Sequence, residues 1–207
     1  MGIDPYRTLT ILVTSMLILA SQSPRRRSLL AMLGLDFAVD TADIDETMDP
    51  ALPPETEVAR LSEAKARAVE QKHPGDLILT ADTVVVVDGC VLGKPHDAEE
   101  AKAHLRRLSG RSHTVMTAFC LLQNGLADVH VEKTHLHFKP LSEGEIAAYV
   151  ASGSPMDKAG AYGIQDQAAV FVRAIEGDYY NVMGLPLCAL VQCLRRRGVA
   201  VLGTVEP

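Results

Sequence analysis

Residues 21–27 carry the densest group of side chains able to bind an anion. Ser21 and Ser23 provide hydroxyls, and Arg25 and Arg26 provide guanidinium groups whose fork matches phosphate oxygens. Ser23 is also a good N-cap, and the proline after it suits a first helical position, so the free N–H groups of a helix start would face the same point. The alternative is a solvated basic first turn, but cations there oppose the helix dipole unless an anion is bound. The segment therefore predicts a phosphate site, although it contains no GxxxxGK[ST] loop.

Asp82 interrupts an apolar run from residue 77 to residue 87. A carboxylate buried there without a partner would be strongly unfavourable. The residue therefore either breaks or bulges the strand, or it lies in a site where it holds a metal ion or takes a proton from water.

Lys65 presents a similar conflict in a helix expected over residues 55–71. Apolar residues at helical spacing form one stripe on this helix, and Lys65 falls in the middle of it. The stripe consists of Val58, Leu61, Ala68 and Val69. An inward lysine must either extend its ammonium group to water or meet an anion, and the anion is the favoured interpretation.

Two further charged segments are open to two interpretations each. Asp43, Asp45 and Glu46 form an acidic turn, which is either solvated or a source of the carboxylate oxygens that hard divalent cations prefer. Lys94, between a glycine and a proline, is either a second phosphate-binding charge or an ordinary loop lysine.

Residues 157–165 combine small side chains with Gly163, which would let the backbone approach a ligand closely. Gln165 can read the edge of a base. A flexible loop is the alternative interpretation of this segment.

Apolar periodicity and turn residues predict the elements that position these side chains. Helices are expected over residues 23–34, 55–71, 97–108, 142–152 and 186–197, and strands over residues 17–20, 37–39, 77–87, 114–122, 129–138 and 169–175. Asp88-Gly89 and Asn124-Gly125 are strong hairpin signals, so the sheet must contain antiparallel pairs. The fold class is therefore α/β, with a mixed sheet and flanking helices.

Length and charge limit the classes of protein that this chain can be. It has 207 residues, 47% of them hydrophobic, which suits one domain or two small lobes sharing a sheet. The formal net charge of −6 repels polyanions and argues against a nucleic-acid partner, so any bound phosphate needs a local basic cluster. The four cysteines show no CxxC motif and no metal-ligand spacing, which indicates reduced residues of a cytoplasmic protein.

The N-terminal region is expected to lie outside the functional fold. The apolar stretch of residues 9–20 is shorter than the roughly 20 residues that a membrane helix needs, and no signal-peptide cleavage site follows it. A clean strand begins at Met16. We therefore interpret residues 1–15 as an extension or expression remnant and residues 16–207 as a single catalytic domain, with no membrane partner.

Taken together, these segments resemble the Maf-like nucleoside triphosphate pyrophosphatases. The matching motifs, in family order, are Leu-Ala-Ser-Gln-Ser-Pro-Arg-Arg from 19, Asp-Ile-Asp-Glu from 43, Glu-Ala-Lys-Ala from 63, Ala-Asp-Thr-Val-Val from 81, Gly-Lys-Pro from 93, Leu-Ser-Gly from 108, Asp-Lys-Ala-Gly-Ala-Tyr-Gly-Ile-Gln from 157 and Val-Met-Gly-Leu-Pro from 182. Each motif alone is weak, but the ordered set spans nearly the whole chain and is highly specific.

The resemblance implies a role for each candidate residue. Asp82 is similar to the family's general base, and Glu46 and Asp82 to the holders of a divalent cation, Mg²⁺ or Mn²⁺. The implied substrate-binding residues, which contact phosphates, are Ser21, Ser23, Arg25, Arg26, Lys65 and Lys94. The implied specificity positions are Arg25, Thr83 and Gln165. An elongated two-lobed fold with a central cleft, related to the inosine triphosphate pyrophosphatases, and a homodimer are also implied.

The expected reaction is hydrolysis of dTTP, UTP and modified pyrimidine nucleotides to the monophosphate and pyrophosphate, because Ala-Asp-Thr with Gly-Ile-Gln resembles the dTTP/UTP branch. Two alternatives stay open. One is a preference for 7-methyl-GTP, whose branch typically carries a Ser-Asp-Gln pattern. The other is a nucleotide-binding regulator of cell division without turnover, against which the intact set of Asp82, Glu46 and Lys65 argues.

Overall fold

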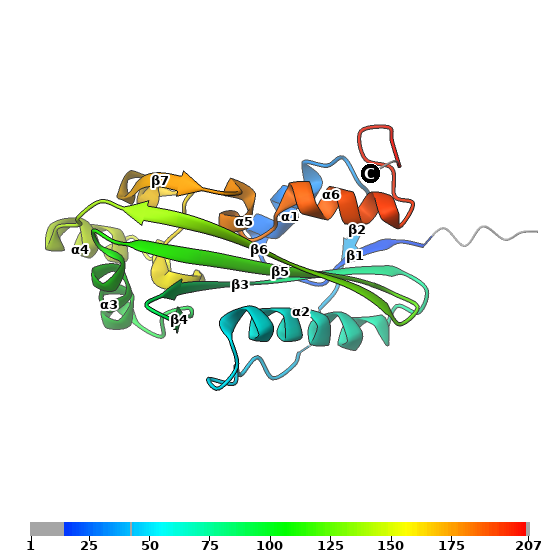
Figure 1. Ribbon diagram of the computed structural model, residues 1–207, viewed down its shortest axis with the longest axis horizontal. Helices are drawn as coiled ribbons and strands as arrows, with labels where there is room; N and C mark the ends of the chain where they lie inside the picture. The colour runs from blue at the N-terminus through cyan, green and yellow to red at the C-terminus, as the bar shows by residue number, and fades with distance from the viewer. Residues whose placement is uncertain (1–14, 42, 206–207) are drawn as a thin grey trace, which may run out of the picture.

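A seven-stranded mixed sheet runs through the whole length of the molecule, with strand order β2-β1-β3-β5-β6-β7 and β4 paired to β3 (Figure 1). The computed structural model describes residues 15–41 and 43–205. The strands are β1 (Leu17–Leu19), β2 (Phe37–Val39), β3 (Leu77–Val87), β4 (Cys90–Leu92), β5 (Ser112–Gln123), β6 (Leu126–Phe138) and β7 (Val172–Glu176). The helices are α1 (Pro24–Ala31), α2 (Pro54–Glu70), α3 (Ala98–Leu108), α4 (Glu143–Ala151), α5 (Tyr179–Met183) and α6 (Leu187–Arg196), and the 3₁₀ turns are η1 (Ser154–Asp157), η2 (Ala159–Ala161) and η3 (Gln167–Phe171).

Local signals set most of these boundaries as predicted. Asp88 and Asn124, at the first position of each hairpin turn, have φ values of 49° and 51°, and the glycine after each also has a positive φ, as two-residue hairpins require. Asp97 caps α3 by accepting a hydrogen bond from the Glu100 N–H. Ser142 and Glu145 form a complete capping box at α4. The predicted antiparallel pairs and mixed sheet are confirmed.

The long strand β3 has a gap in its pairing on one edge. β5 pairs with it from Ile78 to Val86 and fills the other edge. β1 pairs with its first residues, 77–79, and β4 with its last residues, 85–87, so both must lie on the remaining edge. Within the described chain, no strand pairs with residues 80–84 on that edge. The middle of β3 is therefore open from the side.

Two of the four hydrophobic clusters among the described residues lie at opposite ends of the long strand β3 and form the cores of the two lobes. One core contains Leu79 and Ala81 of β3 and packs against α1 and α6. The other contains Val85 and Val87 and packs against α3 and α4. Figure 1 shows the elongated shape that results, with α2 along one face of the sheet and α1, α5 and α6 on the other. The predicted fold class, an elongated mixed-sheet α/β fold, is confirmed.

One predicted strand was placed too early. The strand expected over residues 169–175 begins only at Val172, because residues 167–171 form η3. Asp166 caps that turn by accepting a hydrogen bond from the Ala168 N–H at 2.9 Å, and this local bond holds the apolar residues that follow out of the sheet.

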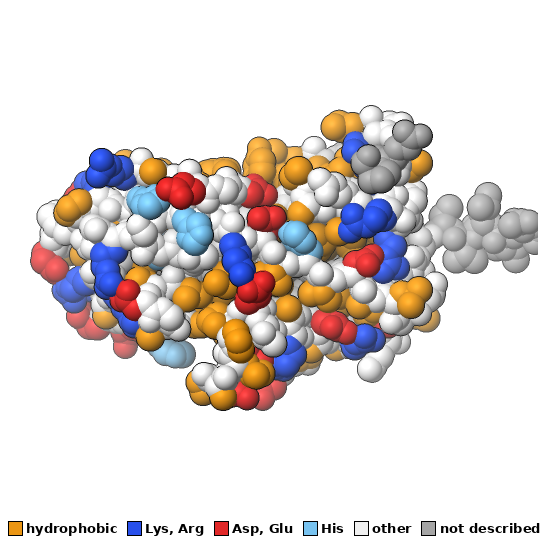
Figure 2. Space-filling view, in the orientation of Figure 1, with side chains coloured by type: hydrophobic (Ala, Val, Ile, Leu, Met, Phe, Trp, Pro, Cys, Tyr) orange, Lys and Arg blue, Asp and Glu red, His pale blue; other side chains and the backbone are white. Residues whose placement is uncertain are grey.

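The remaining features concern the surface, the character of the helices and the N-terminus. Figure 2 shows acidic and basic side chains interspersed along the visible face, with apolar side chains gathered in its middle. None of the helices within the described ranges combines the length and apolar character that crossing a bilayer requires. The predicted extension over residues 1–15 lies, except for Ser15, outside the described residues.

Candidate active site

A cleft of about 1090 Å³ opens at the unpaired edge of β3. Its walls come from the residues that directly follow β1, from the middle of β3, from α2, from the residues that follow β4, and from the segment between α4 and η3. Every residue predicted for the site lines this one cleft: Ser21, Ser23, Arg25, Arg26, Glu46, Lys65, Asp82, Thr83, Lys94 and Gln165. The structure thus brings together side chains that are dispersed over the sequence.

Lys65 lies between two carboxylates at the base of the cleft. Its ammonium group donates a hydrogen bond to Asp82 Oδ1 and lies 3.0 Å from Glu46 Oε1. The Lys65 and Asp82 side chains are each only 14% exposed, whereas that of Glu46 is 61% exposed. The prediction that Lys65 points inward toward an anion is confirmed. The alternative that Asp82 breaks its strand is wrong, since β3 continues through it.

Asp82 Oδ2 is buried and has no hydrogen-bond partner among the described residues. Burial raises the pKa of Asp82 above its usual range, against the opposing attraction of Arg26 and Lys65. A carboxylate with a raised pKa and a free lone pair is a better general base at neutral pH than an exposed one.

The two carboxylates fit a divalent cation only together with a ligand. Within the described chain, no group of three or more Asp, Glu, His or Cys side chains is arranged to hold a metal. Mg²⁺, however, is commonly held by one or two carboxylates, several waters and the substrate's phosphates. Glu46 and the unpartnered Asp82 Oδ2 match that donor set. Asp45 is engaged elsewhere, because it accepts a hydrogen bond from the Thr47 N–H at 2.9 Å.

An ion pair between a buried carboxylate and a half-exposed arginine anchors the loop that carries Glu46. Glu57 on α2 is fully buried and accepts hydrogen bonds from Arg60 and, at 2.7 Å, from the Asp49 N–H. The Arg60 guanidinium and the Asp49 N–H lower the pKa of Glu57 to about 2. Arg60 also donates to the Thr47 carbonyl at 3.1 Å. Sequence reasoning missed this anchor, although the spacing of Glu57 and Arg60 on one helix is typical of an ion pair.

The predicted anion site at the start of α1 has its hydroxyls in place. Ser23 is the N-cap and accepts a hydrogen bond from the Arg26 N–H at 3.4 Å. Ser21 Oγ accepts from the Ser23 N–H at 3.2 Å and from the Arg26 guanidinium at 3.3 Å. The serines therefore face the same end of the helix, as its residue types predict.

Arg26 holds this corner of the cleft together. Its Nε donates to the Gly184 carbonyl at 2.9 Å, and a terminal nitrogen donates to Thr83 Oγ1 at 3.0 Å. Burial lowers the pKa of Arg26, and the nearby Asp82 partly offsets that effect. Since a guanidinium has five N–H groups and three are used here, two remain for a ligand. Thr83, whose hydroxyl also lies 2.9 Å from Thr117 Oγ1, is fixed against this group.

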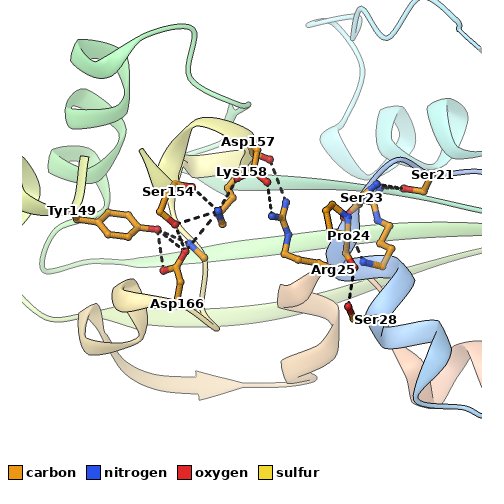
Figure 3. Close-up of polar contacts among 12 residues, drawn as sticks. Ser21, Ser23, Pro24, Arg25, Ser28, Tyr149, Ser154, Asp157, Lys158 and Asp166 are labelled. Carbon is orange, nitrogen blue, oxygen red and sulfur yellow. Dashed lines mark hydrogen bonds and ion pairs between the residues drawn. The ribbon is translucent and has the colours of Figure 1, made fainter. Parts of the chain in front are cut away.

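The opposite wall of the cleft contains Asp157 and Lys158, which sequence reasoning did not single out. Figure 3 shows Arg25 reaching from α1 to Asp157, with Lys158 beside it. Arg25 donates to Asp157 Oδ2 at 2.7 Å, and Lys158 donates to Asp157 Oδ1 at 2.7 Å. Lys94 and Gln165 are exposed at the rim of the same cleft. Asp157 and Lys158 do open one of the motifs that resemble the Maf-like family, but no role was assigned to either residue from the sequence.

Comparison with known proteins gives consistent results. The family model of the Maf-like proteins matches residues 16–197. The dTTP/UTP pyrophosphatase of Symbiobacterium thermophilum is 51% identical over 185 residues, covering 89% of this chain and 95% of that protein. Those of Desulfotalea psychrophila and Salinibacter ruber are 49% and 51% identical, each over 86% of this chain and over 92% and 89% of their own lengths.

Among solved structures, the Staphylococcus aureus Ham1 protein aligns with a TM-score of 0.42 and 15% identity, over 76% of this chain and 91% of that chain. That likeness is too weak to carry an argument.

Proposed function

The chain belongs to the Maf-like protein family, and from that premise we propose that it is a dTTP/UTP pyrophosphatase. The reaction is hydrolysis of a pyrimidine nucleoside triphosphate to the monophosphate and pyrophosphate. One observation supports this proposal most strongly. The cleft contains both the buried, unpartnered carboxylate oxygen of Asp82 and the basic helix start at Arg25 and Arg26. A base and an anion site within one cavity are what hydrolysis of a phosphoric anhydride needs.

The charged residues divide the work between proton transfer and charge stabilisation. Asp82 takes the proton of the attacking water through Oδ2, while Lys65 holds the other oxygen and orients the carboxylate. Arg25 and Lys94, with the hydroxyls of the α1 start, bind the phosphates and stabilise the charge that develops as pyrophosphate leaves. A divalent cation, Mg²⁺ or Mn²⁺, would be held by Glu46 and Asp82 and would neutralise phosphate charge.

Three residues are proposed to set the preference for pyrimidines. Arg25 and Thr83 lie at the α1 side of the cleft, and Gln165 lies at the opposite rim. The relatives named above are dTTP/UTP pyrophosphatases, which supports a pyrimidine rather than a 7-methyl-GTP preference. We further propose a cytoplasmic homodimer, which light scattering and cell fractionation would test.

Pyrophosphate release from dTTP, UTP, 7-methyl-GTP and ITP, with Mg²⁺, Mn²⁺ or a chelator, tests the proposal. Turnover of dTTP and UTP that a chelator abolishes is expected. Turnover of 7-methyl-GTP alone would overturn the specificity, and binding without any turnover would favour a regulator. In the same assay Asp82→Asn should lower turnover by about 100-fold or more. The matched control is Asp88→Asn, since Asp88 is an exposed carboxylate in a hairpin turn.

A further inference from the structure

Three cations of the cleft, Arg25, Lys65 and Lys158, are already paired with carboxylates of the protein. Lys65 is shared by Asp82 and Glu46 at the base. Arg25 and Lys158 share one carboxylate, that of Asp157. A nucleoside triphosphate that enters this cleft must therefore compete with the protein's own carboxylates for these three cations.

Asp157 is far more exposed than Asp82, whose side chain is 14% exposed, so its carboxylate can leave its cations more easily. Its side chain is 58% exposed, whereas those of its partners Arg25 and Lys158 are 24% and 12% exposed. Ion pairs with an exposed member are weak, so separating the carboxylate from its partners is inexpensive. Burial opposes ionisation of Asp157, but the hydrogen bonds from Lys158 and Arg25 outweigh it and hold the pKa of Asp157 below its usual range. The group is thus an anion at neutral pH.

The two cations stay in place without this carboxylate, because each has a second anchor. Arg25 also donates to the backbone carbonyl of Asp157 at 3.2 Å. Lys158 also donates to the Ser154 carbonyl at 2.5 Å.

The anchor of Lys158 is itself fixed from behind. The Ser154 hydroxyl donates to Asp166 at 2.7 Å, and Tyr149 donates to the same carboxylate at 3.0 Å (Figure 3). Hydrogen bonds therefore tie the wall behind Lys158, whereas the side chain of Asp157 is the exposed member of the group.

We propose that Asp157 is an internal competitor for substrate phosphate: its carboxylate occupies Arg25 and Lys158 in the free enzyme, is displaced by the polyphosphate of the nucleotide, and returns to help release the product. The inference rests on the proposed function, since it assigns Arg25 and Lys158 to the phosphates of that substrate. A triphosphate, with about four negative charges, can replace a single carboxylate on two cations, and the returning carboxylate weakens the hold on a product of lower charge.

A purely structural latch between the lobes would predict the opposite effect on affinity. Arg25 comes from α1 and Asp157 from η1, so their pair joins the two walls of the cleft. If the pair served only to hold the cleft in shape, losing it would loosen the site and weaken binding. If Asp157 is a competitor, losing its charge tightens binding.

The test is Asp157→Asn, which removes the charge but keeps the size and the backbone carbonyl that Arg25 contacts. The control is Asp88→Asn, because Asp88 is similarly exposed, at 51%, and pairs with Arg111 far from the cleft. We expect KM for dTTP, and the inhibition constant of at least one product, dTMP or pyrophosphate, to fall about twofold to fivefold in Asp157→Asn and to stay unchanged in the control. An unchanged or raised KM would overturn the proposal.

Two further measurements separate this inference from the proposed function. Calorimetric binding of inorganic tripolyphosphate needs no turnover, so it tests the competition even if the protein hydrolyses none of the nucleotides. The tightening should also shrink in an Arg25→Gln background, because the effect of Asp157 passes through that cation. If Asp157→Asn strengthens binding equally with and without Arg25, the conclusion that Asp157 acts through Arg25 is wrong.

Discussion

Gly163→Ala should damage the cleft more than the fold. A Cβ atom on Gly163 would lie 2.5 Å from Asp166 Oδ2 and 2.6 Å from Lys158 Cε. Both clashing atoms belong to side chains, so the added methyl can be accommodated if Lys158 moves away from Asp157 and the Asp166 carboxylate shifts against the Ser154 and Tyr149 hydroxyls that hold it. The stability cost should then be about 1 kcal/mol, at the low end of overpacking. Displacing a wall of the cleft by about 1 Å can lower kcat/KM by about 100-fold.

Gly160→Ala, three residues earlier, provides the matched comparison. Gly160 has a φ of +68°, which costs an alanine about 1–2 kcal/mol, and its Cβ would lie 2.9 Å from a methyl group of Val85. Val85 is 2% exposed and belongs to a core, so overpacking there adds about 1–3 kcal/mol. The expected total is about 2–5 kcal/mol, with little direct effect on the charged residues of the cleft.

Urea unfolding of both variants and kcat/KM for dTTP, measured well below their unfolding midpoints, check this pair. Gly163→Ala should lose activity and keep most of its stability, and Gly160→Ala should do the reverse. The reasoning is refuted if the two variants lose stability and activity in the same proportion, because the two clashes would then not be confined to separate parts of the structure.

Two other predictions concern stability. Glu57 and Glu145 have pKa values of about 2 in the fold, below the usual 4.5. Their stabilising effect is therefore complete above about pH 4.5 and is lost as the pH falls toward 2. The urea midpoint should drop across that window, and it should drop less in Glu57→Gln. Ser142→Ala removes the N-cap of α4 and should cost about 1 kcal/mol by the same assay, and an unchanged midpoint would contradict the role of the capping box.

Sequence reasoning succeeded where a few neighbouring residues decide the structure. The turn at Asp88-Gly89 needs two positive φ values, and these two residue types tolerate them. The inward side of α2 follows from helical spacing, which is why Lys65 could be expected to meet an anion. The same approach placed the start of β7 too early, since the apolar run before Val172 looks like a strand and only the side chain of Asp166 turns it into η3.

Contacts between distant segments could not be predicted from the residues on either side of them. Arg25 and Asp157 are 132 residues apart, and although an arginine at a helix start indicates an anion, nothing in its own segment identifies Asp157 as that anion. Glu57 looks like an ordinary acidic residue in the first turn of a helix, yet it is fully buried because the loop of residues 43–52 folds back over it. The partner of Arg25 comes from a distant segment, and the burial of Glu57 depends on the path of the loop before it, neither of which local propensity encodes.

The position of Asp82 beside Thr83 shows most clearly what the pairing of the strands adds. Neighbouring residues of a strand point to opposite faces, so strand geometry by itself would place these two side chains in different sites, although the family resemblance assigns both to one. Asp82 does point toward Lys65 on α2, and Thr83 points toward Arg26 on the other face. Both nevertheless line one cleft, because β1 ends before this point and β4 begins after it, leaving the edge of β3 open. The length of two short strands thus decides that a base from one face and an anion site from the other can act on the same substrate.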